Sequence, residues 1–448
     1  MISKNRKVAA VTLGCKVNYY DTEAILEAFA KKGYEIVNFD EFAHVYIINT
    51  CTVTNIGDKK SRQMIRRAKT QNPEAVVCAT GCYAQVNPEE VLGVEGVNIC
   101  WGIKDRGKLI DAVENWFDSQ RIEPVLYVED IAKESIFEPL SVSQMKSRHR
   151  AYLKIQEGCD MFCSYCIIPY ARGRVRSRNL SDILAETSRL SDAGYKEIVL
   201  TGIHVASYGK DFKERGEDIT LLDVIKKCHE VDGIKRIRLS SLEPGVISES
   251  FVKEAQSLDK LCPHFHLSLQ SGCDKTLKAM NRKYTTAQYE KAAALLREYI
   301  KDVSITTDMI AGFPGEGDGD FLESVRFAEK IGFYMIHVFP YARKTGTVAA
   351  KMPDQLDRKT KTERAKVLLD LGERLRSDYM RQFIGKPISV LFEEKLSDGR
   401  YIGQSGNYMP VVKKGTDIEN TIIEAVPRSL SLEGGELCLL CDENVSGD

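Results

Sequence analysis

The sequence contains no apolar run that approaches the length of a membrane-spanning helix, and no signal-peptide pattern precedes its first strand-like segment. We therefore expect a cytoplasmic protein that has no membrane partner. The chain also lacks an excess of charge of either sign. Its net charge of −1 indicates no class of partner by itself, so only local clusters of charge are informative. The 448 residues, 43% of them hydrophobic and 28% charged, are typical of a globular protein with about two to four domains.

Thirteen cysteines are present, an odd number that favours reduced thiols or metal ligands over disulfides. Three of them have C-x3-C-x2-C spacing and form what we call the loop triplet, Cys159, Cys163 and Cys166. Iron–sulfur clusters normally take four cysteines, and the nearest others in sequence are Cys100 and Cys228, so one iron would stay open to a ligand. The alternatives are a structural zinc site, which requires four ligands, and three buried apolar residues.

The spacing of the loop triplet, with Tyr165 directly before its last cysteine, resembles the radical SAM superfamily. The resemblance implies a [4Fe-4S] cluster whose open iron binds the amino and carboxylate groups of S-adenosyl-L-methionine. It also implies that Tyr165 lies against the adenine of that cofactor, and that one-electron reduction yields a 5′-deoxyadenosyl radical. In such enzymes the cofactor performs the difficult chemistry, and the protein positions it.

Strand and helix patterns alternate in the N-terminal part, which predicts an α/β domain with a parallel sheet. Strands are expected at residues 7–14, 45–48 and 75–79, and helices at 21–32 and 59–69. Each strand runs into a cysteine of what we call the edge triplet, Cys15, Cys51 and Cys82. Because the carboxyl ends of parallel strands share one edge, we expect these thiols to converge. Three unrelated buried cysteines are the alternative, whereas Cys78, inside its strand, is interpreted as core packing.

The edge triplet lies in the motifs Gly-Cys-Lys-Val-Asn, Cys-Thr-Val-Thr-Asn and Gly-Cys-Tyr-Ala-Gln, at residues 14–18, 51–55 and 81–85. These motifs resemble the N-terminal domain of the radical SAM methylthiotransferases, and most closely the members that modify N6-threonylcarbamoyladenosine of tRNA. The resemblance implies a second [4Fe-4S] cluster on the edge triplet, which carries the sulfur that a second S-adenosyl-L-methionine methylates. All six cysteines would be catalytic. The methylthio group would be added at C2 of the modified adenine next to the anticodon, after the radical removes its hydrogen.

Two other classes of function remain open. Family members that act on isopentenyladenosine tRNA or on a ribosomal protein share both clusters, and a non-enzymatic iron–sulfur RNA-binding protein would need no S-adenosyl-L-methionine. The family resemblance also implies a reductant such as flavodoxin or ferredoxin, and a sulfur donor.

From residue 151 the alternation restarts and gives six strand–helix units, which predict a partial TIM-like (β/α)6 barrel with its site at the strand C-termini. The resemblance assigns cofactor contacts to residues that end these strands. They are Thr201 and Gly202 for the amino group, Gln270 and Ser271 for ribose, and Ile310 and Gly312 beside adenine. Residues 316–320 depart from the family pattern, although Asp318 or Asp320 could cap the next helix.

After residue 385 the pattern changes to short strands separated by Gly and Asp turns, which predicts a small all-β barrel. It resembles the TRAM domain, an OB-like RNA-binding module in which Tyr401 and Tyr408 could stack on bases. We predict an N-terminal domain at 5–116, a linker at 117–144, a radical SAM domain at 145–376 and the TRAM domain at 377–445.

Two basic runs flank the expected catalytic region. One lies on a single helix and contains Lys59, Lys60, Arg62, Arg66 and Arg67. The other follows the loop triplet and contains Arg172, Arg174, Arg176 and Arg178. Such clusters are typical of phosphate binding, so we expect both runs to hold the tRNA anticodon arm; a solvated surface is the alternative.

Overall fold

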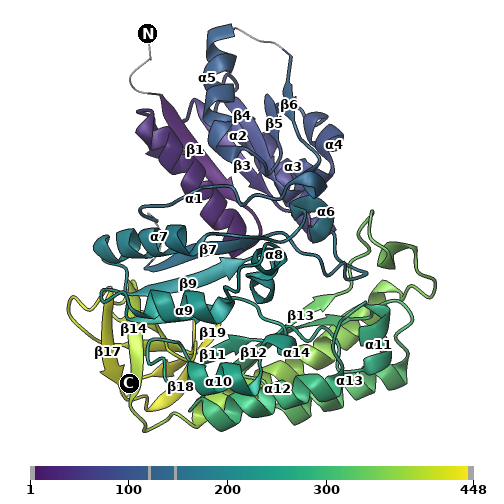
Figure 1. The fold of residues 1–448 in the computed structure, drawn as a ribbon, viewed down its shortest axis with the longest axis vertical. Helices are drawn as coiled ribbons and strands as arrows, with labels where there is room; N and C mark the ends of the chain where they lie inside the picture. Colours follow the sequence, from purple (N-terminus) through teal and green to yellow (C-terminus); the bar gives the residue numbers. More distant parts are fainter. Residues whose placement is uncertain (1–5, 120–122, 146–148, 442–448) are drawn as a thin grey trace.

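A computed structural model describes residues 6–119, 123–145 and 149–441. Three parts follow one another along the chain: an α/β part in purple and blue, a larger α/β part in teal and green, and a β part in yellow (Figure 1). The expected domain limits at residues 5 and 445 lie outside the described residues. None of the helices in the described ranges combines the length and apolarity that a membrane span requires.

The N-terminal domain is built on a six-stranded parallel sheet in the order β2-β1-β3-β4-β5-β6. Its strands are β1 (Lys7–Thr12), β2 (Glu35–Val37), β3 (Val45–Thr50), β4 (Val76–Gly81), β5 (Ile99–Trp101) and β6 (Val125–Tyr127). Its helices are α1 (Lys16–Lys31), α2 (Asn55–Gln71), α3 (Cys82–Val86), α4 (Pro88–Leu92) and α5 (Leu109–Ser119). Strands β3 and β4 are buried along their whole length, because apolar clusters cover both faces of the sheet. The parallel sheet expected from the alternation is confirmed.

Two elements of this domain differ from expectation. Helix α1 begins at Lys16, not at Asp21, because Val17 and Tyr20 extend its buried face toward the N-terminus. The segment expected as a linker, 117–144, contributes β6, which pairs in parallel with β5. Neither short strand has the sustained alternation that reveals a strand in sequence, so the pairing between them was not visible there.

The central part is a curved wall of six parallel strands with helices outside, as expected. The strands are β7 (Arg150–Glu157), β9 (Glu197–Gly202), β10 (Arg236–Leu239), β11 (His264–His266), β12 (Ser304–Ala311) and β13 (Met335–Pro340), with the short β8 (Arg176–Ser177) antiparallel to β7. Parallel bridges at Ile237–Leu261 and Leu242–Leu267 join the β7–β9–β10 group to the β11–β12–β13 group.

The helices of this part are α6 (Ile168–Arg172), α7 (Leu180–Asp192), α8 (Lys210–Glu214), α9 (Leu221–His229), α10 (Glu249–Ala255), α11 (Asp274–Ala279), α12 (Thr286–Tyr299), α13 (Asp318–Ile331) and α14 (Arg358–Arg381). Short 3-10 turns are η1 (Arg106–Lys108), η2 (Ile131–Lys133), η3 (Val205–Ser207), η4 (Pro244–Val246) and η5 (Ala349–Lys351). The expected cap of α13 is confirmed for Asp320, whose Oδ2 accepts from the Gly317 amide at 2.9 Å.

Alternate strand positions divide the barrel into an apolar outside and a polar lumen. Ile198 and Leu200 of β9 and Ile237 of β10 belong to the main apolar core, which packs against the helices. The positions between them, such as Glu197 and Arg238, therefore face the lumen. The lumen therefore contains charged side chains, among them the pair of Arg238 and Glu197. We call its end at the C-termini of the strands the rim.

The C-terminal domain is a six-stranded sheet in the order β17-β14-β15-β16-β19-β18. Its strands are β14 (Ile388–Lys395), β15 (Tyr401–Ser405), β16 (Pro410–Lys413), β17 (Thr421–Ala425), β18 (Ser429–Glu433) and β19 (Glu436–Leu440). It docks at the N-terminal ends of the barrel strands, where Arg236 Nη1 donates to the Gln404 carbonyl at 2.9 Å and Arg238 Nη1 to the Gly406 carbonyl at 2.8 Å. It therefore closes the end of the barrel opposite the rim.

The two tyrosines expected to stack on bases both pack against other residues of the chain. Tyr401 is 2% exposed and belongs to the apolar core of the C-terminal domain. Tyr408 stacks on His264 of β11, with ring centroids 4.7 Å apart, and the Arg238 guanidinium lies 4.9 Å from its ring centre. The expectation is wrong for Tyr401, whose ring is buried in the core of the domain, whereas Tyr408 is half-buried and packs one face of its ring against the barrel.

Candidate active site

The edge triplet converges at the C-terminal edge of the N-terminal sheet, as expected from the strand ends. Cys15 precedes α1, Cys51 follows β3, and Cys82 follows β4 as the first residue of α3. A Cβ placed on Gly14 would lie 3.0 Å from Cys51 Sγ, so glycine is needed for this close approach, and its φ of +105° is one that glycine readily adopts. Burial, and then the charges of Cys82 and Cys15, raise the pKa of Cys51 to about 11. Cys78 is fully buried within β4, in agreement with core packing.

Asn18 ties the loops of this edge together. Its Nδ2 donates to the carbonyls of Leu13 at 2.7 Å and Thr50 at 3.1 Å, the residues before Gly14 and Cys51. Its Oδ1 accepts from Arg172 of the barrel. One buried amide therefore joins two of the cysteine loops to the second domain.

The loop triplet lies between β7 and α6, in a segment folded back on itself. The Cys159 amide donates to the Gly173 carbonyl at 3.0 Å, and the Cys166 amide to the Cys163 carbonyl at 2.9 Å. A Cβ on Gly158 would lie 1.7 Å from the Arg174 carbonyl oxygen, so only glycine fits before Cys159. The loop also holds Phe162 at φ 46°, which is strained for a side chain of this size.

The thiols of the loop triplet are buried or half-buried, and two of them accept hydrogen bonds. No group of three or more His, Cys, Asp or Glu side chains in residues 6–119, 123–145 and 149–441 is arranged to hold one metal ion. Burial raises the pKa of Cys159 and Cys166 to about 12, so their thiolate forms need added positive charge nearby. Iron would supply it, and the Ile168 amide and Arg282 Nη1 already donate to Cys166 Sγ at 3.4 Å and Cys163 Sγ at 3.3 Å.

The two triplets are close in the fold, because α3, which begins at Cys82, packs against α6, which begins just after the loop triplet. Arg172 ends α6, and its Nε donates to Cys82 Sγ at 3.2 Å. The same guanidinium is bonded to Glu157, at 3.1 Å, and to Asp21, at 2.9 Å. This arginine therefore links a thiol of the edge triplet to the helix that follows the loop triplet.

Three arginines of the second basic run are buried, so the expectation that they bind tRNA phosphates is wrong. Arg172 is fully buried, and Arg176 and Arg178 are each 3% exposed. Arg176 Nη2 donates to the Arg172 carbonyl at 3.0 Å, and Arg178 Nη2 to Glu186 at 2.6 Å. Arg172 and Arg178 compensate buried carboxylates, and Arg176 donates to backbone carbonyls. Arg174 alone of this run is exposed, beside the half-exposed Phe162 ring at 5.7 Å.

The basic helix α2 keeps most of its cations at the surface. Lys59, Lys60, Arg66 and Arg67 are exposed, although Arg67 pairs with Asp40. Arg62 is half-buried and pairs with Glu90 at 2.7 Å, so it is the member least able to meet a phosphate. Because α2 begins four residues after Cys51, its first turns lie beside the edge triplet.

The residues that were assigned to cofactor contacts lie near the ends of the barrel strands, but their side chains have different partners. Tyr165 and Ile310 belong to the same apolar cluster, so these two are brought together as adenine contacts would require. Gln270 follows β11 at φ 70°, on the lumen side of the alternation. The Ser271 hydroxyl instead pairs with Ser324 of α13 at 3.0 Å and is 1% exposed, contrary to the expected ribose contact.

The remaining assigned residues lie at close approaches of the backbone. Thr201, 1% exposed, and Gly202 end β9, and a Cβ on Gly202 would lie 2.8 Å from Gln156 Oε1. Gly312 follows β12 at φ +75°, and its amide donates to Glu316 Oε2 at 2.9 Å.

A polar group beside the loop triplet had no role assigned from sequence. Arg282 Nη2 pairs with Glu243 Oε1 at 2.8 Å, and His204 Nε2 lies 3.4 Å from the same oxygen. All three atoms are buried, and their contacts with one another are ion pairs without hydrogen-bond geometry. Glu243 follows β10, so the strand-end rule could have found it. Arg282 lies in the turn between α11 and α12, where no sequence signal points to the rim.

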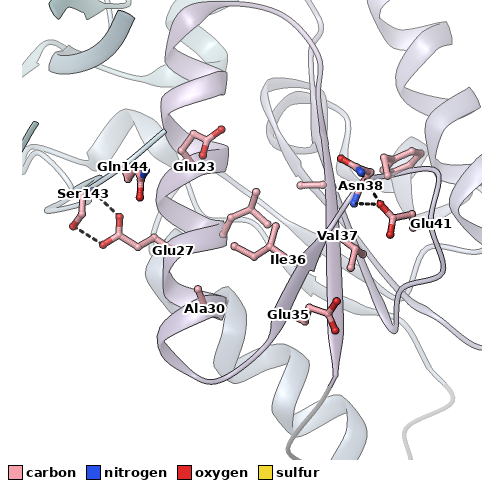
Figure 2. A pocket seen from close by; sticks show the side chains of 13 residues that line it. Glu23, Glu27, Ala30, Glu35, Ile36, Val37, Asn38, Glu41, Ser143 and Gln144 are labelled. Atoms are coloured by element: carbon pink, nitrogen blue, oxygen red, sulfur yellow. Dashed lines mark hydrogen bonds between the residues drawn. The ribbon is translucent and has the colours of Figure 1, made fainter. Parts of the chain in front are cut away.

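The groove in Figure 2 lies away from the cysteines, between α1, β2 and the segment at Ser143. It has a volume of about 600 Å³ and is lined by Glu23, Glu27, Glu35 and Glu41. Glu27 accepts from the Ser143 amide at 2.7 Å and from its hydroxyl at 2.9 Å, which fixes the segment after the N-terminal domain against α1 (Figure 2). Carboxylates of this density repel phosphates, so the groove is unsuited to RNA.

Known proteins resemble both α/β parts of the chain. Residues 7–102 match the family described as uncharacterized protein family UPF0004, and residues 153–328 match the radical SAM superfamily. The threonylcarbamoyladenosine tRNA methylthiotransferase MtaB of Bacillus subtilis (strain 168) is 43% identical over 92% of this chain and 91% of its own. The tRNA-2-methylthio-N(6)-dimethylallyladenosine synthase of Thermoanaerobacter sp. (strain X514) is 36% identical over 87% and 83%. The solved radical S-adenosylmethionine methyltransferase TsrM from Kitasatospora setae aligns over 75% of this chain and 73% of its own, with a TM-score of 0.55 and 16% identity, which shows a shared fold.

Proposed function

Because the chain belongs to the tRNA methylthiotransferases of the radical SAM superfamily, we propose that it methylthiolates C2 of N6-threonylcarbamoyladenosine next to the anticodon of tRNA. The higher identity to the threonylcarbamoyladenosine relative than to the dimethylallyladenosine relative supports this substrate. The observation that carries the proposal is the proximity of two three-cysteine sets: Cys82 opens α3, and α3 packs against α6, the helix that follows the loop triplet.

Each triplet is assigned a cluster. The loop triplet would hold the [4Fe-4S] cluster that supplies the electron for cleaving S-adenosyl-L-methionine, and the edge triplet would hold a second [4Fe-4S] cluster that supplies the methylthio group. Three protein ligands leave one iron of each cluster open, and this chemistry needs that open position. Tyr165 and Ile310 would flank the adenine of the cofactor, with Thr201, Gly202, Gln270 and Gly312 as further contacts.

Arginines of this chain would control the charge beside each triplet. Arg172 donates to Cys82 and Arg282 donates to Cys163, so each thiolate set has one buried guanidinium in contact with sulfur. Hydrogen bonds to thiolate sulfur are one of the ways in which proteins adjust cluster potentials. Arg172 is held in turn by Asp21 and Glu157, which fixes the orientation of its guanidinium.

The tRNA surface is proposed to consist of the exposed cations Lys59, Lys60, Arg66 and Arg67 on α2, together with Arg174. Phosphate contacts by such side chains release counterions and position the RNA without reading its sequence. Phe162, beside Arg174, could stack on a loop base. A reductant such as flavodoxin or ferredoxin and a separate sulfur donor would complete the reaction, in the cytoplasm, where tRNA is processed.

The test uses anaerobically reconstituted protein and two tRNAs that differ only in the modified adenine. One carries N6-threonylcarbamoyladenosine and the other carries isopentenyladenosine, and nucleoside mass spectrometry follows the products. We expect the methylthio derivative of the threonylcarbamoyl substrate only. Conversion of the isopentenyl substrate alone would reassign the substrate within the family, and cluster binding without methylthiolation of either tRNA would reject the enzymatic role.

A further inference from the structure

A cleft beside the loop triplet has no part in the reaction described so far. It has a volume of about 540 Å³ and is bounded by the segment after β10, by α12 and by Met161, which stands between Cys159 and Cys163. Three exposed lysines line it, so we call it the lysine cleft: Lys210, Lys283 and Lys291. The cleft therefore carries three surface cations next to the loop that supplies cluster ligands.

The carboxylates of the lysine cleft do not neutralise its three cations. Glu243 and Glu249 also line the cleft, but Glu243 pairs with Arg282 at 2.8 Å and Glu249 pairs with Lys253 at 2.5 Å. Neither of these two partner cations belongs to the lining. In the ranges that the structure describes, no carboxylate lies within ion-pair distance of the three lysines. The cleft therefore presents positive charge that an anionic partner would complement.

Lys283 connects the lysine cleft to the loop triplet. Its Nζ donates to Asn281 Oδ1 at 2.7 Å, and Asn281 Nδ2 donates to the Phe162 carbonyl at 2.9 Å. The residue before it, Arg282, donates through Nη1 to Cys163 Sγ at 3.3 Å. The surface of the cleft and the thiols of the loop triplet are therefore one or two side chains apart.

The lysine cleft lies on the part of the barrel that is distant from the N-terminal domain. That domain is at the top of Figure 1, whereas α10 and α12, which bound the cleft, are at the bottom. The substrate adenine has to reach both triplets, so the tRNA must approach where the two α/β parts meet, beside the exposed cations of α2. A partner in the lysine cleft would leave that approach open.

We propose that the lysine cleft is the docking surface for an acidic one-electron carrier protein, which reduces the cluster held by the loop triplet. The proposal rests on the proposed function, which requires an electron for each cleavage of S-adenosyl-L-methionine. The carrier is oxidised by one electron and the cluster is reduced by one, so no bond forms between the partners. Electron-transfer complexes are small and transient, and opposite charges on the two partners raise their rate of association. RNA phosphates also attract lysines, but the cleft adjoins the redox site and lies away from the tRNA approach, which favours the carrier.

The experiment compares a protein reductant with a chemical one. Reconstituted holoenzyme cleaves S-adenosyl-L-methionine with either flavodoxin hydroquinone or dithionite as the electron source, in the absence of tRNA. The test variant is Lys210→Gln/Lys291→Gln, which leaves Lys283 in place because that side chain holds Asn281. The control, Lys235→Gln/Lys301→Gln, removes two exposed lysines that precede β10 and β12, at the other end of the barrel. Flavodoxin affinity is measured by surface plasmon resonance and tRNA affinity by fluorescence anisotropy.

At low ionic strength the test variant should lose about 10-fold in flavodoxin affinity and in flavodoxin-driven cleavage, because complementary charge raises association rates by about 10- to 1,000-fold. The loss should diminish as salt is added, whereas dithionite-driven cleavage, tRNA affinity and the control variant should match the native protein. Unchanged flavodoxin affinity would overturn the proposal, and a loss of tRNA affinity in its place would assign the cleft to RNA. An equal loss of dithionite-driven cleavage would also overturn it, because these lysines would then act in the cleavage site itself.

Failure of the proposed function would look different. Native protein that cleaves S-adenosyl-L-methionine with flavodoxin but methylthiolates neither tRNA would reject the proposed function. The docking result would stand, because flavodoxin affinity and uncoupled cleavage are both measured without tRNA.

Discussion

Replacing Asp21 with asparagine should destabilise the contact between the N-terminal domain and the barrel. Asp21 lies on α1, is 1% exposed, and meets cations of both domains. Its carboxylate accepts from Lys154 at 2.8 Å and from Arg172 at 2.9 Å, and it also pairs with Arg106 of the N-terminal domain. Asparagine keeps the size of the side chain and removes the charge, so the three cations lose one of their few buried counter-charges.

These three contacts set an upper limit on the expected loss in free energy of unfolding. Each charge-assisted bond contributes about 1.5–3 kcal/mol, so their sum sets an upper limit of about 9 kcal/mol. Glu157 and Glu138 still pair with the same cations, Arg106 to Glu138 at 2.7 Å, so part of the network survives. Removing one partner from a buried ion network typically costs about 3–5 kcal/mol, and we expect a value in that range.

The assay is guanidinium unfolding of the cluster-free chain under anaerobic, reducing conditions, followed by tryptophan fluorescence. Both tryptophans, Trp101 and Trp116, lie in the N-terminal domain, so the signal reports that domain. The control is Asp111→Asn, which breaks an exposed pair with Lys32 at 3.9 Å and should cost less than about 1 kcal/mol. If Asp21→Asn cost no more than the control, the network would not stabilise the interface.

The difference should also depend on pH in a defined direction. Burial alone would raise the pKa of Asp21, but Arg106, Lys154 and Arg172 together lower it below its ordinary 3.8. A lowered folded-state pKa adds stability above the unfolded value, and that stability is lost as pH falls through the folded value. The native chain should therefore exceed Asp21→Asn in free energy of unfolding by the whole expected amount at neutral pH. This difference should shrink below about pH 4. A gap that widened on acidification would contradict this sign.

Three further outcomes are expected. Reconstituted protein should hold about eight irons if each triplet binds one four-iron cluster. Replacing all three cysteines of the loop triplet with alanine should leave about half of the iron. A variant that kept all of its iron would show that the loop triplet does not bind a cluster. Cys51→Ala should keep reductive cleavage of S-adenosyl-L-methionine and lose methylthiolation, and loss of cleavage in the folded variant would argue against separate roles. Replacing Arg66 and Arg67 with alanine should weaken tRNA binding and lower the log–log salt slope by roughly one per lost phosphate contact, with iron content unchanged; a slope equal to that of the native protein would exclude these side chains from the RNA surface.

The sequence by itself determined the chemistry of the two cysteine sets and the class of fold that carries them. Ligand spacing such as that of Cys159, Cys163 and Cys166 is local, so it can be read along the chain. The convergence of Cys15, Cys51 and Cys82 follows from a general property of parallel strands, so no coordinates were needed to predict it. Strand and helix periodicities are equally local, and they gave both α/β domains and most of the C-terminal strands.

Only the tertiary structure decided which charged and aromatic side chains remain accessible. Arg172 and Arg174 stand two residues apart and look alike in sequence, yet one is fully buried and the other is exposed. The difference depends on Asp21, 151 positions from Arg172, which reaches it only when the two domains dock. Tyr408 is half-buried for a similar reason, because its ring stacks on His264 of the barrel. Burial and charge pairing are properties of the surroundings, and these surroundings come from segments distant in the chain.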